Sequence, residues 1–181
     1  FHSTTTAMLQ MYTTWLEAAE QGDLAGVCMI DMSAAFDVVD NELLLEKLKL
    51  YGFDRRAVQW IWSYLTYRSQ AVYIDGSLSS LLPLEAGVPQ GSILGPLLYT
   101  IFTNELPQVV HEANCPHRSV EGAGMFSIQC QECGGVCCYA DDSTYTATGS
   151  DPLELSEKLT DKYNVLANFL GAASLNVNDD Q

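Results

Sequence analysis

Hydrophobic residues recur at helical spacing in several stretches of the chain. Residues 2–21 carry apolar side chains three and four positions apart, and Ser3 with the threonines after it can cap a helix. The same spacing predicts helices over residues 41–51, 54–67, 93–106 and 152–170. Asp54 is the expected N-cap of the helix that it begins, and Pro96 is tolerated in a first turn.

Strand patterns lie between these helices. A continuous apolar run over residues 24–32 predicts a buried strand with Asp31 near its end. Two runs flanking Gly76 and Ser77 predict a hairpin, and residues 136–148 alternate as two short strands around Asp141 and Asp142. Strands and helices do not strictly alternate, so we expect an α+β fold with helices packed on one face of an antiparallel sheet.

Composition narrows the class of protein. The chain has 181 residues, of which 48% are hydrophobic and 17% charged, which excludes a disordered or fibrous protein and fits one compact domain. Its apolar runs stop short of the roughly 18 residues that a membrane-spanning helix needs, so we expect no membrane segment. It begins with Phe1 and carries no leader pattern, and we expect it to be a piece of a longer protein.

The charge is strongly acidic. Eight Lys and Arg against 23 Asp and Glu give a net charge of -15, whereas a nucleic-acid-binding protein is expected to be basic. Either the partner is not a polyanion, or the basic parts lie elsewhere, or metal ions offset the acidic groups. Five of the six cysteines fall within residues 115–138, which does not suggest a disulfide framework and favours a reducing, intracellular compartment.

Three carboxylates stand where they could act together. Asp31 ends one predicted strand, and Asp141 and Asp142 lie at the turn of a later hairpin. Like charges gathered in partly buried surroundings require a cation, and oxygen ligands suit Mg²⁺ or Mn²⁺. A divalent-metal site follows if the strands are neighbours. The alternative is that the pair merely makes the turn and Asp31 caps the next helix.

Three sequence blocks, in order along the chain, resemble the palm motifs of reverse transcriptases of non-LTR (LINE-type) retrotransposons. Residues 31–37 read Asp-Met-Ser-Ala-Ala-Phe-Asp, and residues 139–142 read Tyr-Ala-Asp-Asp. Between them, residues 87–98 read Gly-Val-Pro-Gln-Gly-Ser-Ile-Leu-Gly-Pro-Leu-Leu. His-Ser-Thr-Thr at residues 2–5 is similar to the family's fingers-to-palm lead-in. The resemblance covers nearly the whole chain except residues 107–135.

The resemblance implies an RNA-directed DNA polymerase that uses two divalent ions, Mg²⁺ or Mn²⁺. In that family, one ion lowers the pKa of the primer 3′-hydroxyl and the other holds the triphosphate and neutralises the leaving pyrophosphate. Asp31 and Asp141 match the family's principal metal ligands, and Asp142 matches the third carboxylate. The backbone carbonyl of Met32 is a further expected ligand.

The resemblance also assigns substrate-binding residues. Phe36 matches the bulky gate under the sugar, which selects dNTP over NTP because the ring fills the space of a 2′-hydroxyl. Gln90 and Gly91 match the loop that contacts the incoming nucleotide and the template. Without the resemblance, Phe36 would be an ordinary core aromatic and the other two residues a turn. Asp37 and Asp40 are assigned to the start of the next helix.

The family pattern implies four segments. They are a fingers-to-palm lead-in helix (1–22), a first part of the palm (23–106), a cysteine-rich insertion (107–135) and a second part of the palm, truncated before the thumb (136–181). The fold expected from the pattern is the palm plus part of the fingers. The full-length protein would bind an RNA template, a DNA primer and dNTP in the cytoplasm and nucleus, without secretion. Because cationic parts of the fingers and thumb lie elsewhere, we expect the isolated piece to be inactive.

The insertion is a candidate zinc site. A Cys-x-x-Cys knuckle presents two thiolates to one metal ion, and a cysteine and a histidine upstream could complete a tetrahedral site. The candidate ligands are Cys115, His117, Cys130 and Cys133, with His111 as a substitute. The alternative is a loop that is merely rich in cysteine, with residues 137–138 buried in the following strand. Two alternatives to an active polymerase remain. The chain could be a catalytically incompetent remnant, or it could be a repurposed acidic interaction module that binds zinc.

Overall fold

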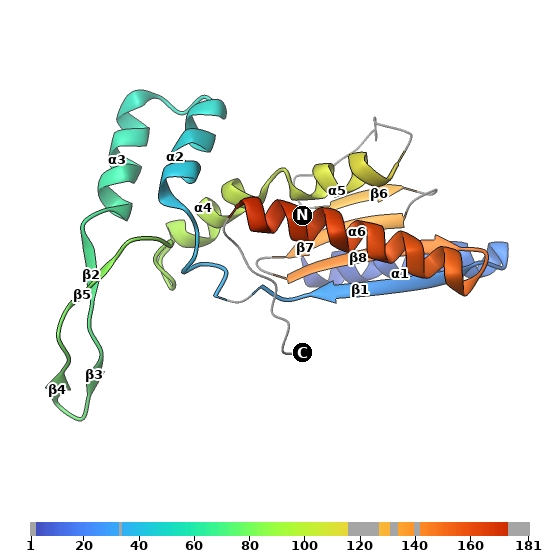
Figure 1. Ribbon diagram of the computed structural model, residues 1–181, viewed down its shortest axis with the longest axis horizontal. Helices are drawn as coiled ribbons and strands as arrows, with labels where there is room; N and C mark the ends of the chain where they lie inside the picture. The colour runs from blue at the N-terminus through green and yellow to red at the C-terminus, as the bar shows by residue number, and fades with distance from the viewer. Residues whose placement is uncertain (1–2, 33, 116–126, 131–133, 140–141, 174–181) are drawn as a thin grey trace. The chain divides into compact units, whose positions relative to one another are not determined.

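The computed structural model describes residues 3–32, 34–115, 127–130, 134–139 and 142–173 (Figure 1). The chain divides into two units, and each is described by itself. The sheet unit consists of Phe1–Ser33 and Asn104–Gln181, and the hairpin unit consists of Ala34–Thr103. Their boundaries fall inside the predicted 23–106 segment, and the four-segment division itself stays a prediction.

The sheet unit contains, in its described residues, a four-stranded antiparallel sheet of order β1-β8-β7-β6. Its strands are β1 (Leu24–Ile30), β6 (Ser127–Cys130), β7 (Gly134–Tyr139) and β8 (Asp142–Gly149). Its helices are α1 (Thr4–Gln21), α5 (Leu106–Asn114) and α6 (Pro152–Ala172). The helices predicted at both ends of the chain are confirmed, and Ser3 caps α1 as expected.

Helices lie on both sides of this sheet. A Cβ on Gly26 of β1 would stand 2.8 Å from Leu159 and 3.1 Å from Leu155, so α6 packs directly on that face. α1 contacts β1 and β7, and Figure 1 shows it behind the sheet while α6 lies in front. The α+β class with an antiparallel sheet is confirmed. The contacts of α1 add a second covered face to the single one that was expected.

β1 is an edge strand in the described sheet, which corrects the prediction of a buried strand. It pairs with β8 alone among the described strands, Met29 is 81% exposed, and Ile30 is the strand's buried residue. A continuous apolar run does not by itself distinguish a central strand from an edge strand. Asp31, which was predicted at the C-terminal end of this strand, comes directly after its last residue, Ile30.

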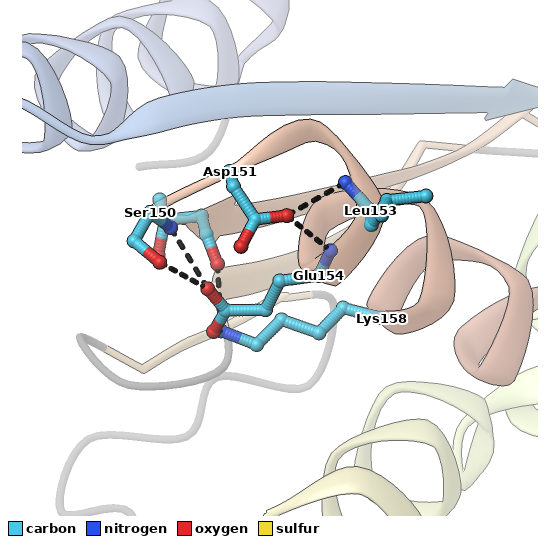
Figure 2. Close-up of polar contacts among 6 residues, drawn as sticks. Ser150, Asp151, Leu153, Glu154 and Lys158 are labelled. Carbon is cyan, nitrogen blue, oxygen red and sulfur yellow. Dashed lines mark hydrogen bonds and ion pairs between the residues drawn. The ribbon is translucent and has the colours of Figure 1, made fainter.

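A cluster of polar groups starts α6 (Figure 2). The Asp151 carboxylate accepts hydrogen bonds from the backbone N–H groups of Leu153 and Glu154, at 2.9 and 3.0 Å. Glu154 pairs with Lys158 at 2.7 Å and accepts from the backbone N–H and hydroxyl of Ser150. The hydrogen bonds from Lys158 and Ser150 lower the pKa of Glu154 to about 2, so its carboxylate stays ionised in mild acid.

Lysines of α6 also reach the backbone of β8. The amino group of Lys162 donates to the carbonyl oxygen of Thr146 at 2.9 Å, and that of Lys158 donates to the carbonyl oxygen of Thr148 at 2.8 Å. The β7–β8 pairing ends at Tyr145, so both carbonyls lie beyond the ladder. The lysine amino groups of α6 therefore bind backbone carbonyls of β8 where its pairing with β7 has ended.

The hairpin unit begins with the helices α2 (Asn41–Leu50) and α3 (Arg55–Leu65). Asp40 caps α2 by accepting from the backbone N–H groups of Glu42 and Leu43, and Asp54 caps α3 by accepting from that of Ala57. Both helices, the Asp54 cap and the placement of Asp40 at a helix start are thus confirmed. α4 (Leu94–Thr103) closes the unit and contacts α2.

A two-stranded ribbon joins α3 to the loop before α4. β2 (Arg68–Gln70) pairs with β5 (Leu82–Leu84), and β3 (Tyr73–Ile74) pairs with β4 (Ser77–Leu78). The hairpin is confirmed, but its turn is Asp75–Gly76, one residue before the predicted pair. Asp75 and Gly76 have φ of 47° and 83°, the left-handed backbone that an Asp-Gly two-residue turn adopts.

The predicted loop over residues 107–135 is wrong in part, because it contains most of α5 and all of β6. α5 has only nine residues, too few for a clear period, yet Leu106 and Val110 are fully buried along it. β6 pairs with β7, with Ser127 opposite Cys137. Among the described residues, no helix is both long and apolar enough to span a membrane.

Candidate active site

Two of the predicted carboxylates adjoin the same end of the β1–β8 pairing. Ile30 of β1 pairs with Ser143 of β8, so extending this antiparallel register by one residue sets Asp31 opposite Asp142. Directly opposed residues in such a ladder have Cα atoms roughly 5 Å apart. Asp31 is half-buried and Asp142 is exposed. The strands carrying the two aspartates are neighbours, which is the condition that the metal-site prediction required.

The third carboxylate, Asp141, lies outside the described residues. Tyr139 of β7 pairs with Asp142 of β8, so the strands flanking it are adjacent. The described residues alone contain no group of three or more His, Cys, Asp or Glu able to hold a metal ion. Two opposed carboxylates at a strand end nevertheless offer the oxygen donors that Mg²⁺ and Mn²⁺ prefer. Met32, whose carbonyl is the other expected ligand, is buried next to Asp31.

The hairpin unit brings Phe36 against the loop that contains Gln90 and Gly91. The backbone N–H of Val88 donates to the carbonyl oxygen of Phe36 at 2.7 Å, and that of Gly87 donates to the carbonyl oxygen of Val39 at 2.8 Å. Two predicted substrate-binding segments, far apart in sequence, are therefore joined by backbone hydrogen bonds.

Gly87 makes this close approach possible. It has a φ of 90°, and a Cβ at this position would stand 2.6 Å from the carbonyl oxygen of Asp37. Any other residue would be strained and would clash with the backbone. The sequence reasoning quoted this glycine only as part of a motif, although its place at the start of the loop was a usable signal.

The ring of Phe36 is held by Tyr99 of α4. Their ring centroids are 4.7 Å apart with an interplanar angle of 34°, and Tyr99 is fully buried. Phe36 itself is half-buried, so it has a fixed inner contact and an accessible side. Sequence reasoning did not single out Tyr99, because its position in an apolar helix gave no sign of this contact.

Gln90 and Gly91 lie in an exposed turn between Gly87 and α4. The hydroxyl of Ser92 donates to the carbonyl oxygen of Pro89 at 2.6 Å and accepts from the backbone N–H of Gly95 at 2.9 Å. Gly91 has a φ of 78° and nothing within 4 Å of its would-be Cβ. The turn therefore presents the Gln90 side chain and an unobstructed backbone outward.

The zinc prediction falls largely outside the described residues. His117 and Cys133 are not among them, Cys130 ends β6, and Cys115 is buried directly after α5. His111 is buried within α5, and α5 contacts β6. A tetrahedral site at these residues stays a prediction.

The two cysteines of β7 are partly buried. Cys137 and Cys138 are half-buried, and burial raises the pKa of both thiols, that of Cys138 to about 11. The hydroxyl of Ser143 donates to the sulfur of Cys138 at 3.6 Å. Because a metal-binding cysteine must be a thiolate, the raised pKa values favour a packing role for these two residues.

Comparison with known proteins identifies the family. Residues 2–180 match the reverse transcriptase (RNA-dependent DNA polymerase) family. The chain belongs to this family. It is 42% identical over 106 residues to the RNA-directed DNA polymerase from mobile element jockey of Drosophila funebris, covering 59% of the chain and 12% of that protein. It is 38% identical over 106 residues to a probable RNA-directed DNA polymerase from transposon BS of Drosophila melanogaster, with the same coverage.

These mobile-element relatives bear out the non-LTR type that the motifs predicted. The chain spans about an eighth of the length of the first of them. A more distant relative, Protein YkfC of Escherichia coli, is 28% identical over 154 residues, which cover 76% of the chain and 39% of that protein. Members of the reverse transcriptase family use divalent metal ions and bind nucleic acid.

Solved structures share the fold. A telomerase from Candida tropicalis matches with a TM-score of 0.63 at 16% identity over the whole chain, which covers 35% of that protein. A telomerase from Candida albicans, in complex with a fragment of telomeric RNA, matches with a TM-score of 0.65 at 14% identity, covering 99% of the chain and 31% of that protein. The polymerase palm-like fold class is thereby confirmed.

Proposed function

We propose that the protein containing this chain is an RNA-directed DNA polymerase that extends a primer 3′-hydroxyl with dNTP on an RNA template. The observation that supports the proposal is the β1–β8 register, because its extension past Ile30 and Ser143 would set Asp31 opposite Asp142. Family membership supports the same activity. A site built on rigid neighbouring strands can hold its carboxylates in a fixed geometry.

Asp31, Asp141 and Asp142 are the proposed ligands of two divalent ions, Mg²⁺ or Mn²⁺, together with the backbone carbonyl of Met32. Bound ions would activate the primer hydroxyl and neutralise the charge that develops on the triphosphate. The half-buried place of Asp31 suits this role, since a partly desolvated carboxylate attracts a cation more strongly than one in water.

Phe36 is the proposed sugar gate, and Gln90 with Gly91 contacts the nucleotide and template. The ring contact with Tyr99 and the hydrogen bond from Val88 support this role, because a steric gate works only if its ring cannot move aside. The turn carrying Gln90 is exposed and its amide can both donate and accept. These features support discrimination of the sugar by shape and recognition of the base pair by hydrogen bonds.

The isolated chain is proposed to be inactive. With eight Lys and Arg and a net charge of -15, the chain has too few cationic side chains to neutralise the phosphates of a primer–template duplex, which dominate affinity. The remaining length of the parent protein would supply them. The full-length protein is therefore the correct material for testing activity.

The test is primer extension on an RNA template by the full-length protein with Mg²⁺. Asp31→Asn replaces a charged ligand by a neutral and weaker one, so we expect extension to fall by about three orders of magnitude or more. Asp23→Asn is the matched control, because Asp23 precedes the opposite end of β1 and has no proposed ligand role. Its rate should stay within about twofold of wild type.

Two outcomes would contradict the proposal. Near wild-type extension by Asp31→Asn would remove this residue from the metal site. A folded full-length protein that binds template and primer but extends with neither Mg²⁺ nor Mn²⁺ would support the noncatalytic remnant instead.

A further inference from the structure

We propose that a pocket between α2 and α3 binds a base and phosphates of single-stranded nucleic acid. The pocket lies within the hairpin unit and has a volume of about 440 Å³. None of the candidate active-site residues lines it. It falls in the size range of ligand sites, which are mostly apolar with a few placed polar groups.

The lining combines an apolar floor with aromatic walls. Leu45 of α2 and Val58 of α3 are each 9% exposed and form the buried part of the lining. Phe53, between the helices, is 39% exposed, and Trp62 of α3 is 43% exposed. Aromatic rings that remain accessible in a hollow can stack on a nucleobase, and every base offers a face for stacking.

Trp62 is held by a perpendicular ring contact and stays partly exposed. Tyr67 packs against it edge-on, with ring centroids 5.5 Å apart and an interplanar angle of 86°. An edge-to-face contact orients the indole without a second ring covering it in parallel. By contrast, Trp60 is stacked on Tyr64 at 9° and does not line the pocket.

Two cations flank the aromatic walls. Lys49 lies in the last turn of α2, and Arg55 is the first residue of α3. Lys49 pairs with Glu46 at 2.6 Å, but both side chains are more than half exposed, so the pair is weak and a phosphate can replace the carboxylate. Arg55 is exposed and its planar guanidinium suits phosphate oxygens.

The charge distribution points to the same unit. Five of the eight Lys and Arg lie in Ala34–Thr103 beside seven Asp and Glu, whereas the sheet unit carries three against sixteen. A polyanion is therefore repelled least at the hairpin unit. The strand that would occupy the pocket is the template of the proposed polymerase, so the inference rests on the proposed function.

An acidic peptide fits the pocket less well than a nucleic acid. A bound peptide backbone needs many hydrogen-bonding partners, but the uncharged polar groups of the lining, all of which lies in the described part of the chain, are the Gln59 amide and the Trp62 indole N–H. A nucleotide needs only ring faces and cations, both of which are present. Stacking and phosphate pairing are also independent of sequence, as a template site requires.

The experiment measures fluorescence anisotropy of a fluorescein-labelled hexa-adenylate RNA titrated with the 181-residue chain at low salt. A short strand carries few charges and limits repulsion by the acidic sheet unit. Trp62→Ala should weaken binding by about fivefold or more, because stacking on one base is lost. Trp60→Ala, which removes an equally large exposed ring outside the pocket, should change the affinity by less than about twofold.

A charge-matched pair gives a second readout. Arg55→Gln should make the salt dependence of hexa-adenylate binding shallower by about one unit in the log–log slope, because one phosphate contact is lost. Arg56→Gln, at the next position and outside the lining, should leave the slope unchanged. Circular dichroism verifies that all four variants, which alter exposed residues, keep the wild-type helix content.

Three results would overturn the inference. They are no binding of hexa-adenylate by the wild-type chain, equal effects of the pocket and control variants, or tighter binding of a labelled peptide of alternating Glu and Trp with the same Trp62 dependence. Hexa-adenylate binding is measured on the 181-residue chain without divalent ions, whereas extension is measured on the full-length protein with Mg²⁺. Loss of extension and loss of pocket binding are therefore separable, and the failure of either proposal can be told from the failure of the other.

Discussion

The side-chain amino group of Lys162 donates a hydrogen bond to the carbonyl oxygen of Thr146 at 2.9 Å, although Lys162 is only 2% exposed. This contact links the middle of α6 to β8, the strand that begins with Asp142. A buried ammonium group is costly unless it is hydrogen-bonded, so the helix and the strand are held in one arrangement. The position of the candidate site thus depends on a residue remote from it.

Lys162→Ala should lower the free energy of unfolding by roughly 2–4 kcal/mol, because it removes a charged hydrogen bond and buried aliphatic packing. Lys158→Ala, at a site that is about one third exposed, should cost roughly 1 kcal/mol. Urea unfolding followed by circular dichroism measures both. Equal costs would mean that burial of Lys162 adds nothing.

Gly87→Ala should destabilise the hairpin unit by about 2 kcal/mol or more, because the new Cβ would be strained at a φ of 90° and would stand 2.6 Å from Asp37. Gly91→Ala isolates the backbone effect, since Gly91 also has a positive φ but open space around it. We expect it to cost about 1 kcal/mol. Thermal unfolding of the two variants tests the difference, and similar costs would refute the close approach.

Stability should fall with rising pH because of Cys138. Burial raises the pKa of its thiol from 9.0 to about 11, so above pH 9 the unfolded chain releases a proton that the folded chain retains. The thiol's contribution is complete below pH 9 and is lost by pH 11, with a slope of roughly 1.4 kcal/mol per pH unit. Cys138→Ala should flatten the decline in urea unfolding between pH 9 and 10.

Cys28 is the internal comparison for the predicted effect of Cys138 on the pH dependence of stability. Burial also raises the pKa of the Cys28 thiol, but less, so Cys28→Ala should flatten the decline less than Cys138→Ala does. Burial chiefly raises the pKa of Tyr145 too, and charge on Cys138 or Cys28 adds to that rise, so each variant also loses a part of the Tyr145 contribution. Identical pH profiles for wild type and Cys138→Ala would contradict the assignment.

Phe36→Ala in the full-length protein should leave extension measurable and increase ribonucleotide incorporation about tenfold or more, because the space under the sugar opens. Phe36→Tyr keeps the ring and should retain the wild-type preference for dNTP. Competition between dNTP and NTP in primer extension gives the ratio. If Phe36→Ala kept the wild-type preference for dNTP over NTP, Phe36 would have no gating role and would serve only to pack against Tyr99.

The zinc prediction is tested by metal content. Protein purified under reducing conditions should contain about one zinc per chain, and Cys130→Ser with Cys133→Ser should remove it. Cys137→Ser is the control, because its thiol has a raised pKa and no predicted ligand role. Zinc-free wild-type protein would favour a loop that is simply rich in cysteine.

Local signals in the sequence predicted the helices well and the sheet less well. Asp40 and Asp54 are short-range signals, since each cap acts within three residues of its own position. The exposure of Met29 depends on which strands flank β1, a long-range property that an apolar run does not encode. α5 was missed because its nine residues are too few to show a period.

In the candidate site too, short-range features could be predicted from the sequence and long-range contacts could not. The motif residues Asp31, Asp142 and Phe36 were found from the sequence, whereas Tyr99 was not, because a buried tyrosine in an apolar helix resembles any core residue. The contact of Gly87 with Asp37 also required coordinates, since the two lie on segments far apart in the chain. Candidate residues could be named where they belong to a motif, whereas the packing around them could not be predicted.

The interrupted path of the chain through the sheet unit has a consequence for how this protein acquires its structure. β1 is made early and finds its partner β8 only after Ala34–Thr103 and the segments beyond have been added. The hairpin unit is continuous and its pairings are short-range, so it can fold first, whereas closing so long a loop slows the β1–β8 pairing. Refolding should therefore show helix formation in the hairpin unit before the two aspartates are brought opposite each other. During synthesis, the end of the sheet that carries the candidate site would be among the last features to form.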